Sequence, residues 1–377
     1  MNGRGVISLA AVLGIAVSGC GFGAETDNLT YRFLRLEESA PKLNGIVNSY
    51  LDDILKKSNE KLAANGADPR RASDTEVELT FVQTYIDVVV RRFGDRLLPV
   101  FGTCIEKNDC PGWPHFERIP LEGKESIYGQ AGYNRVAIAF LSPSFQLCGV
   151  RLGTDKLTHL FSHGFFYYNA GRQKRIRLDD EEARRMSLAD EWGLMGARST
   201  AVVSPADAQA TVAGYRLATD YFLGENPVFG RNAETGLLQK RRDLDVCSYV
   251  SQGFDEVVNP PTFTARRGRV ARLEAAIEER RAVNDWAEKS LSPEEQRAWK
   301  DRIVQRPLDP SHARLPWAYK IYLVLKYIVA YLTIPAESRA PTSFVVFPNF
   351  KLKDRRPIVL RREPARARSA ADARHVL

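Results

Sequence analysis

The chain has 377 residues, of which 44% are apolar and 27% are charged, and its formal net charge is +8. This composition excludes a chain that is disordered throughout, and it provides enough apolar side chains for one large or two smaller globular domains. The positive charge is concentrated in residues 351–377, which contain nine basic and three acidic residues, so the rest of the chain is nearly neutral.

The N-terminal residues have the pattern of an export signal. Arg4 precedes an apolar run over 6–17, which leads into Val17-Ser18-Gly19-Cys20. A run of this length is typical of a secretory signal peptide and is too short to span a bilayer, which takes roughly 20 residues. The last four residues resemble the lipobox of bacterial lipoproteins, in which the cysteine is lipidated. We therefore predict a signal peptide over 1–20 and lipidation at Cys20; secretion without a lipid and an uncleaved anchor are the alternatives.

The predicted location is the bacterial cell envelope, with the chain lipid-anchored and facing the periplasm. Gly21 follows Cys20, where enterobacterial lipoproteins retained at the inner membrane carry Asp, so the outer membrane is favoured over the inner one. Anchoring to a membrane through Cys20 is therefore the first predicted partner contact. An exported chain is not expected to bind nucleic acid.

Four cysteines follow Cys20, at Cys104, Cys110, Cys148 and Cys247. An even number in an oxidising compartment predicts two disulfides. The short loop of the first pair favours Cys104–Cys110, which leaves Cys148–Cys247. Four buried free thiols are the alternative, and zinc binding by these cysteines is disfavoured because no Cys-x-x-Cys pair is present.

The first half of the chain mixes helices with short extended segments. Apolar periodicity predicts a helix over 41–63, and a capping box at Ser73–Glu76 begins a second helix that runs to Gly94. Two extended runs around Cys148-Gly149 predict a small β-hairpin. Three further segments are interpreted as a short tether over 21–38, an irregular region over 101–134 and a strand over 136–141.

The second half is predicted to be helical. A helix begins at Thr154-Asp155, and another begins where Ser204 precedes Pro205. Further helices are predicted over 179–197, 243–258 and 266–306, the last with an internal start at Ser292-Pro293. The apolar segment 317–334 is interpreted as a core helix, with an interfacial or spanning membrane helix as alternatives, and 343–347 as a strand.

These elements predict a mainly α-helical, irregular fold with a small β-hairpin and a helical C-terminal extension. The predicted organisation is a signal peptide over 1–20, a core domain over 21–262, a helical extension over 263–350 and a basic, disordered tail over 351–377. Contact of this tail with anionic lipid, lipopolysaccharide or peptidoglycan is one interpretation, and a solvated tail without a partner is the other.

The helix that begins at Thr154-Asp155 carries the clearest chemical pattern. Asp155, His159 and His163 recur every four residues and share one helix face. Two histidines at this spacing can bind one metal ion, although Leu160 stands where a metalloprotease helix would carry Glu. The same residues are also explained by structure alone, with Asp155 near the helix start and His163 packed among aromatic side chains.

At these residues the chain resembles a family of uncharacterised bacterial periplasmic lipoproteins with an Asp-Lys-x-x-His helix. The similarity covers roughly 140–262 and continues through 191–196, Ser204-Pro205-Ala206-Asp207 and 249–260. Thr158 stands where such relatives are expected to carry Gly. The resemblance implies the envelope location and no reaction, because the family has no assigned activity.

Other acidic residues complete the candidate site. If Cys148 bonds Cys247, the segment with Asp255 and Glu256 is brought close to the histidine helix, and we group these two acids with Asp155, His159 and His163 as candidate catalytic residues. Two further acids are interpreted as structural. Glu191 is expected to be exposed, and Asp207 is expected to complete a helix cap.

Two functions follow from these observations. The first is a non-catalytic envelope lipoprotein, an adaptor or binding protein at the periplasmic face of a membrane, with no cofactor expected. The alternative is a metal- or histidine-dependent envelope hydrolase that uses His159 and His163, with zinc as its metal.

Overall fold

The computed structural model describes residues 25–64, 68–90, 100–133, 141–173, 178–193, 195–197 and 200–307. Over these residues the fold is mainly α-helical with a few short strands, as predicted. Several predictions lie outside the described residues: the signal peptide with Cys20, most of the strand at 136–141, the segments 317–334 and 343–347, and the tail at 351–377.

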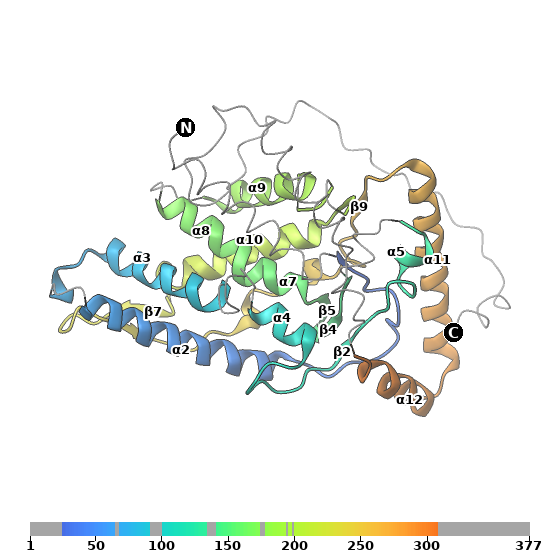
Figure 1. Ribbon diagram of the computed structural model, residues 1–377, viewed down its shortest axis with the longest axis horizontal. Helices are drawn as coiled ribbons and strands as arrows, with labels where there is room; N and C mark the ends of the chain where they lie inside the picture. The colour runs from blue at the N-terminus through green and yellow to red at the C-terminus, as the bar shows by residue number, and fades with distance from the viewer. Residues whose placement is uncertain are drawn as a thin grey trace, which may run out of the picture.

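The helices are the main elements (Figure 1). They are α2 (Ala40–Ala64), α3 (Asp74–Tyr85), α4 (Val100–Lys107), α5 (Ile127–Gln130), α7 (Asp155–Thr158), α8 (Gly164–Gln173), α9 (Asp180–Trp192), α10 (Pro205–Asp220), α11 (Arg267–Ser290) and α12 (Pro293–Val304). Single helical turns are η2 (Pro69–Arg71), η5 (Val246–Ser248) and η6 (Gln252–Phe254), of 3₁₀ type, and η3 (Ile86–Val90) and η4 (His159–His163), of π type. Among the described residues, none of these helices is both long and apolar enough to cross a membrane.

The predicted helix starts are present with their capping contacts. Ser73 and Ser292 each form a reciprocal capping box at the start of α3 and α12. The Ser204 side chain accepts a hydrogen bond from the Asp207 backbone N–H, and Pro205 fills the first position of α10. Each cap supplies an acceptor to an otherwise unpaired amide at a helix start, so the chain direction at these points is set locally.

The strands are short and form small sheets. They are β1 (Glu25–Thr26), β2 (Arg118–Ile119), β3 (Leu141–Ser142), β4 (Ser144–Leu147), β5 (Val150–Gly153), β6 (Val202–Val203), β7 (Phe229–Arg231), β8 (Leu238–Lys240) and β9 (Thr262–Phe263). β1 pairs in parallel with β3, β2-β4-β5 form a three-stranded sheet, and β6-β9 and β7-β8 are antiparallel pairs. β4 and β5 are the predicted hairpin, and Cys148 and Gly149 in its turn both have positive φ, as the favoured two-residue hairpin turn requires.

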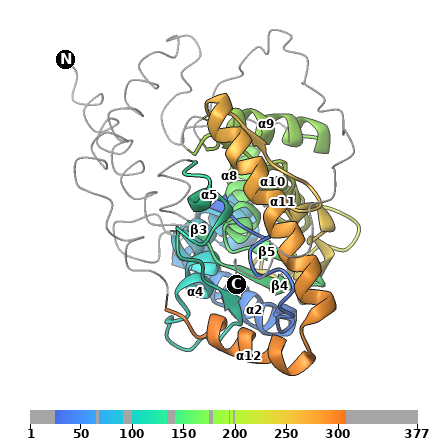
Figure 2. The same cartoon turned by 90° about the vertical axis from the view of Figure 1, so that its right-hand side faces the viewer.

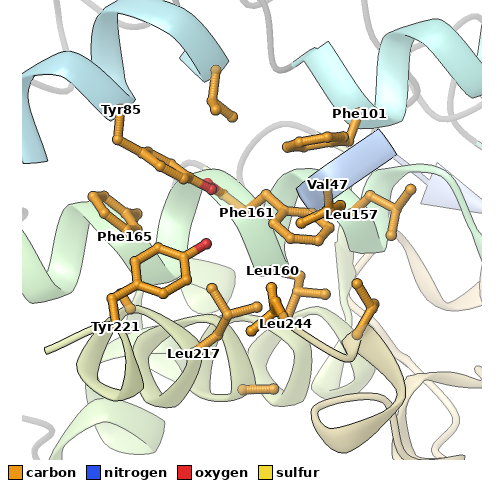
Figure 3. Packing of buried hydrophobic residues seen from close by; sticks show 14 of the residues in the cluster. Val47, Tyr85, Phe101, Leu157, Leu160, Phe161, Phe165, Leu217, Tyr221 and Leu244 are labelled. Carbon is orange, nitrogen blue, oxygen red and sulfur yellow. The ribbon is translucent and has the colours of Figure 1, made fainter. Parts of the chain in front are cut away.

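The larger apolar core lies between α2, α3, α8 and α10. Figure 3 shows Phe165 of α8 between Tyr85 of α3 and Tyr221 at the end of α10, and Phe161 of η4 beside Phe101 of α4. Tyr85 stacks on Phe165 with ring centroids 3.8 Å apart, and Tyr221 packs edge-on to Phe81 at 5.8 Å. This packing fixes the position of η4, which carries both candidate histidines.

A second apolar cluster joins the two ends of the described chain. Leu29 and Phe33 pack with Leu273 of α11 and Ile303 of α12. Figure 2 shows α11 crossing this end of the molecule with α12 beneath it. Asn284 of α11 donates to the Leu29 carbonyl at 2.7 Å, so polar contacts support the same packing.

Three predictions about local structure are wrong. The helix over 243–258 is absent: η5 and η6 are single turns, because side chains such as Asp245, which accepts from the Cys247 N–H, satisfy the backbone outside a helix. The region over 101–134 was predicted to be irregular, but it contains α4. Residues 100–105 are all buried, so this helix has no polar face that would reveal it in the sequence. The tether over 21–38 is also wrong where it is described, because residues 25–30 are buried.

Candidate functional site

The candidate helix follows directly from β5. Gly153 ends the strand, and a Cβ atom at this position would lie 1.8 Å from the Thr26 side-chain oxygen, so β1 approaches only because the residue is glycine. α7, η4 and α8 then run on without a break, from Asp155 to Gln173. A Cβ atom at Gly214 of α10 would lie 2.1 Å from the Leu160 carbonyl, so a second glycine lets α10 lie directly against η4.

Lys156 is the centre of the site, and its side chain is completely buried. Its Nζ lies 2.6 Å from Asp207 Oδ1, 2.8 Å from Glu256 Oε1 and 2.9 Å from Asp155 Oδ2. Burial alone would lower the pKa of Lys156, but the attraction of these three carboxylates raises it well above its usual value. The ammonium is therefore charged at neutral pH. It donates hydrogen bonds to Asp155 and Glu256 and forms an ion pair with Asp207.

The members of this group come from segments far apart in the sequence. Asp207 lies in the first turn of α10, and Glu256 follows η6. From β1, the Thr26 hydroxyl donates to Asp155 Oδ1 at 2.8 Å, and Glu25 accepts a hydrogen bond from Thr200. The polar group thus connects β1, α7, α10 and the segment after η6.

Burial raises the pKa of three carboxyl groups around Lys156. The pKa of Glu256 is about 8, because burial and the nearby Asp207 and Asp155 outweigh the attraction of Lys156. Burial, reinforced by neighbouring carboxylates, also raises the pKa of Glu25 and of Glu191 well above the usual value. The raised pKa values limit the negative charge that the protein interior has to hold.

The two histidines lie beside this group. His159 Nε2 is 3.5 Å from Asp207 Oδ2, and His159 Nδ1 is 3.0 Å from the Thr211 hydroxyl. His163 Nδ1 lies 3.1 Å from His159 Nδ1. Burial lowers the pKa of both imidazoles to about 3, and the neighbouring His159 contributes to this shift at His163. Both rings are therefore neutral at neutral pH.

The structure brings most of the predicted site residues together. Asp155, His159 and Glu256 belong to one buried group, and His163 lies at its partly exposed edge. Asp255 is turned away from this group. Its carboxylate accepts from Arg32 Nη2 at 2.6 Å and from Asn28 at 3.4 Å, and it caps the Val257 N–H.

Two acids differ from the interpretation of the sequence. Glu191 was expected to be exposed, and this is wrong: it is 3% exposed, and its carboxylate lies against Gly196, where a Cβ atom would be 2.8 Å from Oε2. Asp207 contributes its backbone N–H to the Ser204 cap, but its carboxylate is directed at Lys156.

Sequence reasoning missed Lys156, Asp207, Glu191 and Glu25 as members of the site. The sequence could have indicated that Lys156 is buried. It lies four residues before Leu160, on the apolar side of the helix, where a solvated lysine is not expected. Glu25 and Glu191 offered none, since their burial depends on contacts with distant segments.

Both predicted disulfides are present, Cys104–Cys110 and Cys148–Cys247. The second joins the hairpin turn that precedes α7 to η5, nine residues before Glu256. This disulfide therefore holds the segment with Glu256 close to the helix with Lys156. In the sequence, the same cysteine pair predicted this proximity.

The donor atoms of this region form two sets with the spacing of metal ligands. One set is Asp155, Asp207 and Glu256, and the other is His159, Glu191 and Asp207; in each, the ligand atoms lie within 4.8 Å of one another. The first set already surrounds the Lys156 ammonium. The second set includes His159 but not His163, in contrast to the predicted pairing of the two histidines.

Comparisons with known proteins found no match, whether with protein-family models, with curated proteins or with solved structures. The resemblance to the lipoprotein family with an Asp-Lys-x-x-His helix therefore stays a prediction.

Proposed function

We propose that the chain is a lipid-anchored protein of the bacterial envelope with a non-catalytic role, as a scaffold or binding protein at the periplasmic face of a membrane. The observation that carries the non-catalytic part of this proposal is the Lys156 group. Its side chains are completely or almost completely buried, and their hydrogen bonds and ion pairs join distant segments of the chain. This is the arrangement expected of a polar core that specifies a fold.

The alternative of a histidine-dependent hydrolase has less support. A general base is effective when its pKa lies near the working pH, and burial lowers the pKa of His159 and His163 to about 3. The three carboxylates hold Lys156 in its protonated form, and a protonated amine has no free lone pair for attack on a substrate.

Two further observations support the location. The two disulfides suit an oxidising compartment such as the periplasm. In addition, β1 begins at Glu25, so a lipid on Cys20 would be separated from the buried strand by only four residues. Five Cα–Cα steps span at most about 18 Å when fully extended. The folded body would therefore be held directly beside the membrane.

The location is tested by lipid labelling in a bacterial host. With radiolabelled palmitate, we expect the wild-type chain to be labelled and to accumulate as a precursor in globomycin. Cys20→Ser should abolish the labelling. A Cys148→Ser/Cys247→Ser double variant removes two other cysteines and should keep it, and labelling of the Cys20→Ser variant would contradict the proposed anchor.

The non-catalytic role is tested with His163→Gln, which changes the partly exposed histidine and leaves the Lys156 ion pairs in place. Purified wild-type protein is assayed against panels of ester, phosphate, glycoside and peptide substrates. We expect no turnover above that of the variant. A hydrolytic activity that is lost in His163→Gln while the melting temperature is unchanged would establish the hydrolase instead.

A further inference from the structure

The buried polar group has more carboxyl groups than Lys156 can neutralise. Five carboxyl groups face one another in this region and are between 2% and 7% exposed: Glu25, Asp155, Glu191, Asp207 and Glu256. Lys156 supplies one positive charge to them. Isolated buried charges are costly, so such a group retains protons or takes up a cation.

The position of Lys156 determines where a cation would fit. Its Nζ occupies the space between Asp155, Asp207 and Glu256, all within 2.9 Å. The neighbouring set is on the other side of Asp207, where Oδ2 faces His159 Nε2 at 3.5 Å while Oδ1 binds Lys156. The Asp207 carboxylate thus contacts the Lys156 ammonium with Oδ1, and its Oδ2 faces the His159 imidazole.

His159 is oriented in the way that metal-ligating histidines are. Its Nδ1 lies 3.0 Å from the Thr211 hydroxyl and 3.1 Å from His163 Nδ1, so the ring is held through the nitrogen that does not face the carboxylates. A hydrogen bond at one ring nitrogen fixes the tautomer and directs the lone pair of the other nitrogen. Here that other nitrogen is Nε2, which faces Asp207 Oδ2 at 3.5 Å, and His159, Asp207 and Glu191 form the second set of ligand atoms.

A buried oxygen without a hydrogen-bond partner belongs to the same acidic group. Glu25 is 2% exposed; its Oε1 accepts from Thr200, whereas its Oε2 has no hydrogen-bond partner. After burial itself, the charges of Glu256, Asp207 and Glu191 raise the pKa of Glu25, so Glu25 belongs to the same buried acidic group. A buried acceptor without a donor is expensive, and a cation at the neighbouring set would compensate it.

We propose that His159 Nε2, Glu191 and Asp207 bind a divalent metal ion of the zinc type. One imidazole and two carboxylates are ligands that zinc accepts, and three protein ligands leave a fourth position open. His163 does not bind the ion; together with Thr211 it orients His159. The proposal goes beyond the envelope role, because that role requires no metal.

Metal binding is tested on purified full-length mature protein without a histidine tag, stripped with chelator and titrated with ZnCl₂. We expect one zinc ion per chain, measured by calorimetry and by elemental analysis after gel filtration. Glu191→Gln should weaken binding at least about 100-fold, and Thr211→Val about 10- to 100-fold through loss of the orienting contact. His163→Gln removes the other orienting contact and should weaken binding about 10- to 100-fold as well. Glu60→Gln, at an exposed position of α2, is the matched control and should bind zinc like the wild type.

Absorption spectroscopy at the zinc edge tests the ligand set without any variant, in case Glu191→Gln does not fold. We expect nitrogen and oxygen ligands at about 2.0–2.2 Å, a single imidazole and no sulfur. Two imidazoles, or a His163→Gln variant that loses zinc as completely as Glu191→Gln, would overturn the assignment. Failure of the wild-type protein to retain zinc after gel filtration would also overturn it.

Discussion

The Lys156 ammonium lies 2.8 Å from Glu256 Oε1, although the two residues are 100 positions apart in the chain. Lys156 belongs to α7, whereas Glu256 lies in a segment that contains only single helical turns. Burial holds the pKa of Glu256 at about 8 in spite of this contact. The contact therefore holds the irregular segment around Glu256 against α7. Without Lys156, the buried Glu256 carboxyl group would lack a charged partner.

The segment that follows the predicted anchor is expected to be part of the stable fold. Asp27 is 1% exposed and accepts hydrogen bonds from the Leu29, Thr30 and Ile127 backbones. A soluble chain that begins at Glu25 should melt like the mature protein. A chain that begins at Asn28 should lose about 2–5 kcal/mol of unfolding free energy in urea titrations, because buried groups lose their partners. Equal stability of the two chains would show that β1 does not contribute.

The hairpin turn should make stability depend on acidic pH through Glu38. Its carboxylate accepts from the Cys148 and Gly149 backbones at 2.7 and 2.8 Å. Partial burial raises the pKa of Glu38, but these and other backbone hydrogen bonds outweigh it, so the pKa is lower than usual. Such a group stabilises the fold above its unfolded pKa, and the stabilisation is lost as the pH falls through the lower, folded pKa.

Glu38→Gln tests this dependence. At pH 7 the variant should melt below the wild type, by an amount that corresponds to less than about 1 kcal/mol because Glu38 is exposed to solvent. The difference should be smaller at pH 3, which lies below the ordinary pKa of a glutamate, because the unfolded state then binds the proton. Glu60→Gln, at an exposed position of α2, serves as the control and should show no such trend. A difference that is constant between the two pH values would contradict the role of Glu38.

The two disulfides should contribute unequally to stability. Cys148–Cys247 closes a loop of 99 residues and Cys104–Cys110 a loop of 6. Loop-closure entropy in the unfolded chain gives about 4.7 kcal/mol for the long loop and about 2 kcal/mol for the short one. Paired Cys→Ser variants, compared by chemical denaturation, should follow this order. The reverse order would mean that native-state packing rather than chain entropy dominates.

Local signals predicted a large part of the fold. The capping boxes at Ser73 and Ser292, the Ser204-Pro205 start and the Cys148-Gly149 turn each depend on residues within four positions of one another, and all are present. The segment 243–258 was mistaken for a helix because side-chain contacts such as Asp245 with the Cys247 N–H replace helical hydrogen bonds there. Apolar content alone does not reveal that competition.

The candidate site was predicted only in part, for a related reason. Asp155, His159 and His163 share a helix face, and periodicity is enough to find them. Lys156, Glu191 and Glu25 are defined by long-range contacts, and a charged residue in a sequence is expected at the surface unless a distant partner is known. Asp255 and Glu256 are neighbours in the sequence, yet one binds Arg32 and the other Lys156.

The most direct test of the account is the unfolding free energy of Lys156→Met, compared with Lys57→Met. Lys57 forms an exposed pair with Asp53, so its replacement should change stability by less than about 1 kcal/mol. Replacing Lys156 leaves Asp155, Asp207 and Glu256 buried without their cation, and we expect a loss of about 3–5 kcal/mol in urea titrations. A Lys156→Met protein as stable as the Lys57→Met control would contradict the claim that this buried group organises the fold.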